Sequence, residues 1–517
     1  MTSALERRGA APSALARLPW MRRLAVLLCA VSLPAAAYNE AIHALLTRRA
    51  FAGRDAWMAE PLVPPTQADL DAFRALFWRT AGQLPEPALR AKFLSRWPSE
   101  QAFTAWELKQ LFLLDPAAAV HGFDLVDAGP MSRGDLLAAA SRWPDDDERN
   151  RHRYLRGADH GIVRAPDGSP VPYDPATLDF GSLTGTTSQG HAHYGLVTEP
   201  LSDDPAVLKN EPWRFAVPPT AHAYGAELAQ LYTDLSLLAA GSDLASREWL
   251  AACFAGAAFH HLEDVGNQIH TVQVGIYEFF RDAWLQSKLR DLRTLGGLLG
   301  ERRSLRQIGL RLIANHHLFS EDLFAKRVLA GAPEVRAAID GLSGDDAGLA
   351  ARVPPGPDFG RAIAQATIDV SSREGGEVYR LAYRLTTPTL RDGMGHEYDG
   401  SAGDDPDAYL RVDPAALAAF YELEGRGLRR ASTALRLWQA RFDAKRAEAV
   451  PAVAVQRSLA LLLPYHEAAA ARRAAYQPAA EEHLGTAWGY PAATLALLCV
   501  IGAALFKRRR RNASHAV

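Results

Sequence analysis

Apolar residues recur at helical spacing along most of the chain, and segments that alternate as a strand does are few. The clearest strand signal is Ile162–Tyr173, in which Pro166–Pro170 has the composition of a hairpin turn. The pattern therefore predicts a mainly α protein, with Gly341–Phe359 and Gly393–Pro406 as loops or linkers rich in Gly, Pro and Asp. Helices are predicted at Asp69–Trp78, Pro87–Arg96, Ala221–Ala240, Glu248–Leu262, Leu305–Leu318, Gly360–Arg373, Pro414–Gln439 and Val455–Tyr476.

The first 37 residues have the pattern of a secretory signal peptide. Several arginines precede the apolar run Leu24–Ala37, which ends in three alanines, the small residues that a signal peptidase requires. Cleavage after Ala37 would make Tyr38 the first residue of the exported protein. An uncleaved N-terminal anchor is the alternative interpretation.

The segment Trp488–Phe506 is uncharged and mostly apolar, and the five cations Lys507–Arg511 follow it. A helix of about 19 residues, rising about 1.5 Å per residue, just spans a hydrocarbon core of about 30 Å. We expect a C-terminal membrane anchor with a basic cytoplasmic tail rather than a buried last helix. Sorting tails that are later removed have the same pattern, so retained and processed anchors both fit. The body is expected outside the cytoplasm, in the periplasm or at the cell surface.

Charge and cysteine content narrow the function classes. The formal net charge is −2, and part of the positive charge lies in the two termini, so the body is acidic. No broad basic field for duplex nucleic acid is therefore predicted. Of the three cysteines, Cys29 and Cys499 lie in the terminal segments and Cys253 alone lies in the body. An internal disulfide framework is thus excluded, and stability must come from the core and from bound metals.

The strongest signal for chemistry is a block of metal-ligating residue types at His260, Asp264 and His270. His260 and Asp264 are four residues apart, so on a helix both project from one face and can bind one metal ion. Gly266 is expected to end this helix, and His270 would return from the following loop. His261 is displaced about 100° around the helix, which predicts a second-shell or surface contact.

Three further elements add candidate ligands. His317 and Glu321 repeat the spacing of four residues, and His316 beside them is assigned to second-shell or surface contacts. His193 lies in a glycine-flanked loop, and His43 follows soon after the predicted cleavage site. A single such pair is usually a solvated pair or a core hydrogen bond, so it is the joint occurrence that predicts a metal site.

The order and spacing of these elements resemble the zinc-dependent phospholipase C and single-strand-specific zinc nuclease superfamily, an all-helical fold. The resemblance covers roughly 38–50, 154–194 and 218–329. It implies three zinc ions. One would be held by Asp159, His193, His260 and Asp264. A second would be held by His270, His317 and Glu321. The third would be held by His43, by Asp264 as a bridge, and by the backbone amino and carbonyl groups of Tyr38.

Two departures from the family pattern affect these assignments. Asp159 and His193 lie farther apart than their family counterparts, which the predicted hairpin would explain, and Asp179 competes with Asp159 as ligand. The family usually has tryptophan where this chain has Tyr38. Tyrosine supplies the same backbone atoms, so ligation by the new N-terminus remains the expectation.

The resemblance implies hydrolysis of a phosphodiester by a zinc-activated water, with Asp159 as general base. Phospholipase C-like cleavage of phospholipid head groups is preferred, because Glu321 matches that branch and an anchor places the enzyme beside lipid. The alternatives are a single-strand nuclease or nucleotidase, and a non-enzymatic membrane-anchored zinc protein. The expected division of the chain is a signal peptide at 1–37, a catalytic helical domain at 38–330 with an insertion at about 55–150, a helical extension at 331–485, an anchor at 486–506 and a tail at 507–517.

Overall fold

The structure, a computed structural model, describes residues 40–105, 107–108, 130–142, 144, 194–195, 197–198, 223–273, 305–391, 398, 403–446, 448 and 451–475. The chain divides into a unit of Met1–Arg473 and a unit of Ala474–Val517, and the described residues belong almost entirely to the first unit. Helices make up most of the described part, as the hydrophobic pattern predicts. The predicted signal peptide, the hairpin at Ile162–Tyr173 and the anchor at Trp488–Phe506 lie outside the described residues.

The elements follow one another in two groups along the chain. The first group is α2 (Glu40–Ala50), α3 (Asp55–Met58), β1 (Pro61–Leu62), α4 (Gln67–Gly82), α5 (Pro87–Arg96), β2 (Met131–Ser132), α8 (Arg133–Ala140) and β3 (Val197–Thr198). The second group is α12 (Gly225–Ala240), α13 (Arg247–Asp264), η4 (Gln268–His270), β4 (Val272–Gln273), α15 (Leu305–Leu329), α16 (Pro333–Asp340), η5 (Gly341–Ser343), α17 (Ala347–Ala350), α18 (Phe359–Leu385), α19 (Pro406–Tyr409), α20 (Pro414–Lys445) and α21 (Pro451–Ala475).

Every helix predicted from the sequence is confirmed, but α18 runs on to Leu385, well past the predicted end at Arg373. Two glycines, Gly375 and Gly376, interrupt the hydrophobic pattern there. Gly375 has a packing reason: a Cβ at this position would lie 2.5 Å from the carbonyl oxygen of Gln268. The glycine lets α18 pass close to the loop that carries His270, so the interruption marks a contact and not a helix end.

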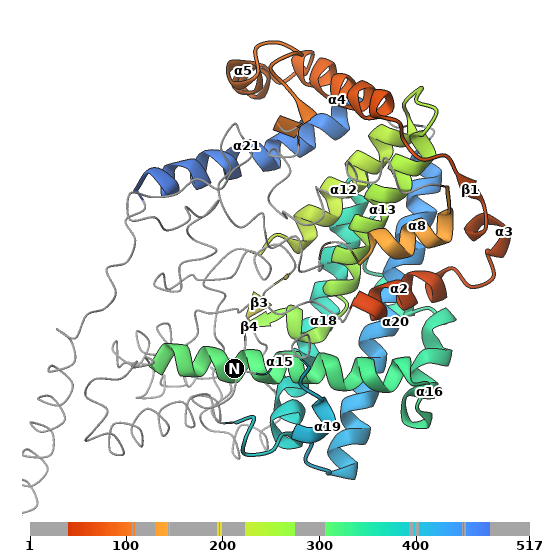
Figure 1. Cartoon of the computed structure of the whole chain (residues 1–517), viewed down its shortest axis with the longest axis vertical. Coiled ribbons are helices and arrows are strands. Elements are labelled where there is room, and N and C mark those ends of the chain that lie inside the picture. The colour runs from red at the N-terminus through yellow and green to blue at the C-terminus, as the bar shows by residue number, and fades with distance from the viewer. Residues whose placement is uncertain are drawn as a thin grey trace, which may run out of the picture. The chain divides into compact units, whose positions relative to one another are not determined.

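The helices α12, α13, α18 and α20 pack side by side and enclose the main core (Figure 1). Helix α13 is buried along its length from Trp249 to Asp264, as expected for a central helix surrounded by others. Phe359 and Trp438 share one hydrophobic cluster with Trp249. Helices from both sides of residue 330 thus contribute to the same core.

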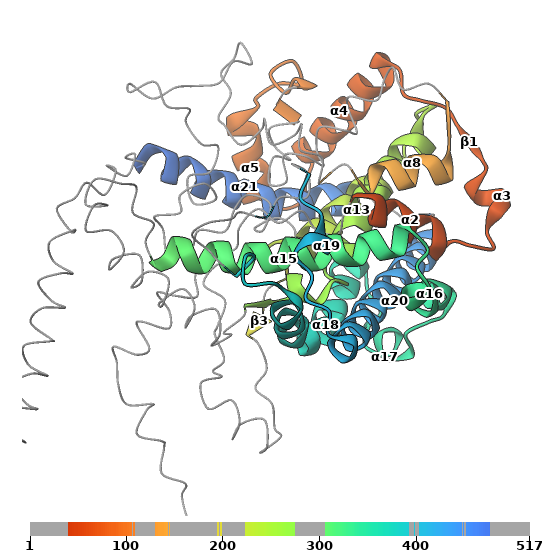
Figure 2. The same ribbon diagram turned by 60° about the horizontal axis from the view of Figure 1, so that its bottom comes forward.

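Helix α2 lies against α8, and α15 runs past α2 and α18 (Figures 1 and 2). Two short strand pairs tie distant segments together. Strand β1 pairs antiparallel with β2, and β3 pairs parallel with β4. Strand β4 begins two residues after His270, so its pairing with β3 brings the chain around Val197 close to this histidine.

The segment Gly341–Phe359, predicted as a linker, packs onto α20. It contains η5 and α17, and its side chains Leu342 and Leu349 are buried. Arg436 on α20 donates hydrogen bonds to the carbonyl oxygens of Leu342 at 2.8 Å and Gly344 at 2.7 Å. These bonds satisfy backbone acceptors that a free linker would leave to water.

No helix in the described part of the chain is both long enough and apolar enough to span a bilayer. Cys253 is a buried free cysteine on α13, and burial raises the pKa of its thiol.

Helix α8 packs against α13 at Gly256, and this contact yields the first prediction. A Cβ at Gly256 would lie 2.3 Å from the Cβ of Ala140 and 3.0 Å from the carbonyl oxygen of Leu137. Because backbone must move to relieve this overlap, Gly256→Ala is expected to lower the free energy of unfolding by about 1–3 kcal/mol in urea denaturation. Gly82→Ala is the control, since its Cβ would meet only Leu94 at 3.8 Å. Equal stability of the two variants would contradict the prediction.

Candidate metal centre

The first group of candidate ligands joins α2 to the last turn of α13. The donor atoms of His43, His260 and Asp264 all lie within 4.8 Å of one another. The Nε2 atom of His260 is 3.0 Å from Oδ2 of Asp264, and Nε2 of His43 is 3.6 Å from Oδ1 of the same carboxylate. All three side chains are fully buried. We call this set the first triad.

The second group joins η4 to α15. The Nε2 atom of His270 is 3.0 Å from Nε2 of His317 and 3.0 Å from Oε1 of Glu321. The distance from His317 Nε2 to Glu321 Oε1 is 3.3 Å. Glu321 is the most exposed of these residues, at 5%. We call this set the second triad.

The turn after α13 places His270 opposite Glu321. Helix α13 ends at Asp264, and Asn267 caps the following η4 by accepting a hydrogen bond from the backbone N–H of Ile269 at 3.3 Å. The amide group of Asn267 also donates to Oε1 of Glu321 at 2.9 Å. One side chain thus fixes both the turn and the carboxylate that faces His270.

Strand pairing brings the segment after His193 to the same place. The backbone N–H of Gly195 donates to the carbonyl oxygen of His270 at 3.1 Å, and that of Val197 donates to Thr271 at 2.9 Å. The ring of Tyr194 packs on His270, with ring centroids 4.6 Å apart. Its hydroxyl oxygen lies 3.5 Å from Nε2 of His317. Tyr194 is therefore part of the wall of the second triad.

Three of the four triad histidines use their Nδ1 atoms for contacts outside the triads. His260 Nδ1 lies 2.8 Å from the carbonyl oxygen of Ser141, His43 Nδ1 lies 2.6 Å from Glu263 Oε2, and His317 Nδ1 lies 2.9 Å from the Tyr379 hydroxyl. A carbonyl oxygen can only accept, so His260 carries its proton on Nδ1. Its Nε2 atom then faces Asp264 Oδ2, where either a second ring proton or a bound cation can bridge the two atoms.

The donor spacing fits such a cation. A tetrahedral zinc ion with bonds of about 2.0–2.1 Å holds neighbouring ligand atoms about 3.3 Å apart. Five donor separations within the two triads lie between 3.0 and 3.6 Å and surround that value. Two imidazoles and one carboxylate are also a donor set that zinc accepts, with a coordination position left for water. Each triad can therefore hold a divalent metal ion.

Asp264 and His270 connect the two triads. Oδ1 of Asp264 faces both Nε2 of His43 and, at 4.0 Å, Nδ1 of His270. The other nitrogen of His270 belongs to the second triad. Ions bound at the two triads would thus be neighbours linked by one carboxylate and one imidazole.

Burial sets the charge states around the second triad. Burial, reinforced by the neighbouring His270, holds the pKa of His317 well below its ordinary value, so the ring is neutral and able to bind a metal. Burial raises the pKa of the Tyr379 hydroxyl, which stays protonated. At the first triad, burial raises the pKa of Glu263, and the hydrogen bond from His43 opposes that shift.

The structure brings together six of the residues predicted as ligands: His43, His260, Asp264, His270, His317 and Glu321. The other predicted ligands, Tyr38, Asp159 and His193, lie outside the described residues, as does the competing Asp179.

The neighbouring histidines belong to neither triad. His316 is buried; its Nδ1 bonds the carbonyl of Leu312 at 2.6 Å and its Nε2 bonds the Thr386 hydroxyl at 3.0 Å. His261 is also buried and stacks on Tyr232, with ring centroids 5.6 Å apart. Of the two predicted alternatives, second-shell or surface contacts, the surface alternative is thus wrong for both residues, because the packing around α13 and α15 buries them.

Sequence reasoning missed Glu263 and Tyr379, which contact triad histidines from outside, and Thr47, which holds Glu263. Thr47 donates to Oε1 of Glu263 at 2.9 Å, so a residue of α2 holds the carboxylate that bonds His43. The spacing offers a signal for Thr47, which lies one helical turn after His43 and shares its face. Tyr379 lies on α18, a helix far along the chain, and no local sequence pattern predicts its contact with His317.

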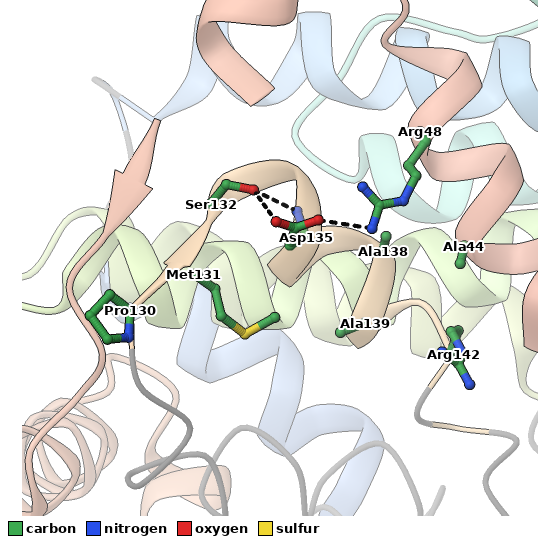
Figure 3. A pocket seen from close by; sticks show the side chains of 9 residues that line it. All are labelled: Ala44, Arg48, Pro130, Met131, Ser132, Asp135, Ala138, Ala139 and Arg142. Atoms are coloured by element: carbon green, nitrogen blue, oxygen red, sulfur yellow. Dashed lines mark hydrogen bonds and ion pairs between the residues drawn. The ribbon is translucent and has the colours of Figure 1, made fainter. Parts of the chain in front are cut away.

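A surface pocket of about 410 Å³ lies between α2 and α8 (Figure 3). Arg48 reaches across it and forms an ion pair of 2.9 Å with Asp135, whose carboxylate also accepts from Ser132. The pocket is lined by Ala44, Arg48, Pro130, Met131, Ser132, Asp135, Ala138, Ala139 and Arg142. None of the triad residues lines it, so the candidate metal chemistry lies elsewhere.

No protein-family model, curated protein or solved structure matched the chain when it was compared with them.

Proposed function

We propose that the chain is an exported zinc-dependent phosphodiesterase with phospholipase C-like activity. The observation that supports this best is the pair of buried His/His/carboxylate triads, linked through Asp264 and His270. Two linked metal sites are a common arrangement for phosphodiester hydrolysis, because such sites can stabilise both the attacking and the leaving oxygen.

The proposed ligand sets follow the order of the sequence. His260 and Asp264 would share an ion with Asp159 and His193. The second triad would hold another ion. His43 would hold a third ion together with Asp264 and the backbone of Tyr38, so the donors of the first triad would be divided between two ions that share Asp264. Zinc bound in this way neutralises the charge of a phosphodiester and activates water near neutral pH.

The protein's own groups have separate tasks in this scheme. Asp159 is proposed as the base that accepts the proton of the attacking water. Ser141 and Tyr379 keep His260 and His317 turned toward the site by occupying their outer nitrogens. Asn267 holds Glu321 in place opposite His270.

The preferred substrate is a phospholipid. This choice depends on the predicted signal peptide and C-terminal anchor, which would place the site outside the cytoplasm and beside lipid head groups. The acidic body also argues against long nucleic acid as the substrate.

A paired substitution on α15 tests the activity. His317→Gln is expected to lower hydrolysis of bis-p-nitrophenyl phosphate by at least about 100-fold and to reduce bound zinc, because a ligand of the second triad is lost. His316→Gln is the matched control: it changes the adjacent buried histidine, which bonds Leu312 and Thr386 instead. The purified full-length protein would be assayed for turnover and for metal content. Unchanged turnover in the His317 variant would refute the proposal.

A panel of substrates then distinguishes phospholipase C-like activity from nuclease activity. Phosphatidylcholine, single-stranded DNA and RNA would be offered to the same preparation. Release of diacylglycerol alone supports the phospholipase assignment. Nucleotide products alone would replace it with a nuclease.

One observation favours a second function, a structural metal site without catalysis. The triad residues are at most 5% exposed, and structural zinc sites are closed to solvent in this way. Bound zinc in the wild-type protein, without turnover of any substrate on the panel, would support this function.

A further inference from the structure

The imidazole of His43 lies between two consecutive carboxylates of α13. Its Nδ1 is 2.6 Å from Oε2 of Glu263, and its Nε2 is 3.6 Å from Oδ1 of Asp264. All three side chains are fully buried. The first distance is that of a short hydrogen bond, and the second exceeds an ordinary hydrogen bond. The two carboxylates therefore have different tasks.

The second oxygen of Glu263 is also held. Thr47, one turn after His43 on α2, donates its hydroxyl proton to Oε1 at 2.9 Å. Glu263 is thus fixed by two residues of the helix that carries His43. A rotation of the carboxylate would break one of the two hydrogen bonds, so its orientation is set.

We propose that Glu263 and Thr47 form a clamp that positions His43 as an Nε2 ligand and strengthens metal binding at the first triad. The inference rests on the metal binding in the proposed function and is independent of the substrate. Nothing in the spacing of the ligands alone assigns this role to Glu263.

The clamp would act in two ways. An acceptor at Nδ1 keeps the ring proton there and leaves the Nε2 lone pair facing Asp264 and His260. A buried carboxylate behind the ring also makes the imidazole a stronger donor to a cation. At the second triad, His317 has the neutral hydroxyl of Tyr379 in the same position, which lacks this charge. The clamp therefore belongs to the first triad alone.

A hydrogen bond inside the core is the simpler explanation for these contacts. A merely structural Glu263 would affect folding but would leave the affinity for metal unchanged in the folded protein. The two explanations therefore separate in a measurement of metal binding.

The test is zinc binding to the full-length protein, by competition with a chromophoric chelator. Glu263→Gln keeps the shape of the side chain and removes its charge. We expect the protein's affinity for one zinc ion to fall by about 10–100-fold, while its affinity for the other zinc ions is unchanged. Cobalt substitution provides a spectroscopic check, because the visible absorption of the weakened site alone should change. Unchanged affinity and an unchanged cobalt spectrum in Glu263→Gln would overturn the proposal.

The matched control is Glu424→Gln, which removes another fully buried carboxyl group from a core helix. Burial, with the nearby Glu374, raises the pKa of Glu424 to about 8. This variant is expected to retain wild-type affinity for every zinc ion. An equal loss of zinc in both variants would show a general effect of core damage and would overturn the clamp.

Thr47→Val covers the case in which Glu263→Gln does not fold. This variant leaves the carboxylate of Glu263 in place and removes only the hydroxyl donor. We therefore expect the affinity for the same zinc ion to fall by about 3–10-fold, less than for the loss of a residue that bonds a metal ligand directly. Thr47→Ser should restore the affinity, and no loss in Thr47→Val would count against the clamp. If wild-type protein binds zinc but hydrolyses nothing, the proposed enzyme fails while the clamp stands. If it hydrolyses substrate and Glu263→Gln binds zinc normally, only the clamp fails.

Discussion

Asp264→Asn is expected to lower hydrolysis of a phosphodiester by about 1,000-fold, equivalent to about 4 kcal/mol of transition-state stabilisation. Among the residues that the structure describes, Asp264 is the one whose two oxygens face histidines of both triads. Oδ2 lies 3.0 Å from His260, while Oδ1 faces His43 at 3.6 Å and His270 at 4.0 Å. An amide group would present N–H protons where a cation is expected, and one negative charge would be lost. The measurement is kcat/KM together with zinc content.

Asp234→Asn is the control for this variant. Asp234 is a buried aspartate on the neighbouring helix α12, where it pairs with Arg457 of α21 and not with a triad histidine. Its loss should reduce stability while the folded protein keeps its turnover per bound zinc. Wild-type turnover and zinc content in Asp264→Asn would rule out the proposed centre.

Removal of metal is expected to lower the melting temperature by at least about 8 °C. Without cations, the carboxyl groups of Glu263, Asp264 and Glu321 are buried with little exposure to water. When the free metal concentration is about 1,000 times the Kd of a site, binding adds about 4 kcal/mol to the free energy of unfolding. Each 1 kcal/mol corresponds to a shift of about 2–4 °C in the melting temperature of a domain of this size. Thermal unfolding would be followed before and after dialysis against a chelator.

Two further observations make this test specific. Adding zinc back should restore the original melting temperature. His317→Gln should show a smaller shift on chelation than the wild type, because one site is already weakened. A chelator that leaves the melting temperature of the wild type unchanged would contradict metal binding at both triads.

The helices and half of the candidate centre could be predicted from local patterns. His260 with Asp264, and His317 with Glu321, are pairs four residues apart on helices, so their common face follows from helix geometry alone. Gly266 correctly marked the end of α13, which lets His270 return from η4.

The remaining features depend on contacts between distant parts of the chain. The bond between His43 and Glu263 spans 220 residues, and the resemblance to the zinc phospholipases placed His43 but not its partner. The prediction of a loop or linker at Gly341–Phe359 did not include its packing onto α20, because the composition of a segment does not show the helix onto which it packs. The helix predicted at Gly360–Arg373 stops short of Gly375, a glycine that allows the close approach of Gln268 within the longer α18.

The wide separation of the contacts around the two triads has a consequence for the order of events during synthesis. His43 on α2 must meet α13, and His317 on α15 must meet Tyr379 on α18. Domains emerge N-terminus first, and contacts between distant segments form slowly. A nascent chain that ends before α18 lacks the partner that orients His317, so the complete centre assembles only after that helix has emerged. If the triads bind metal ions as proposed, the full set is acquired late, from the supply in the compartment where the chain folds.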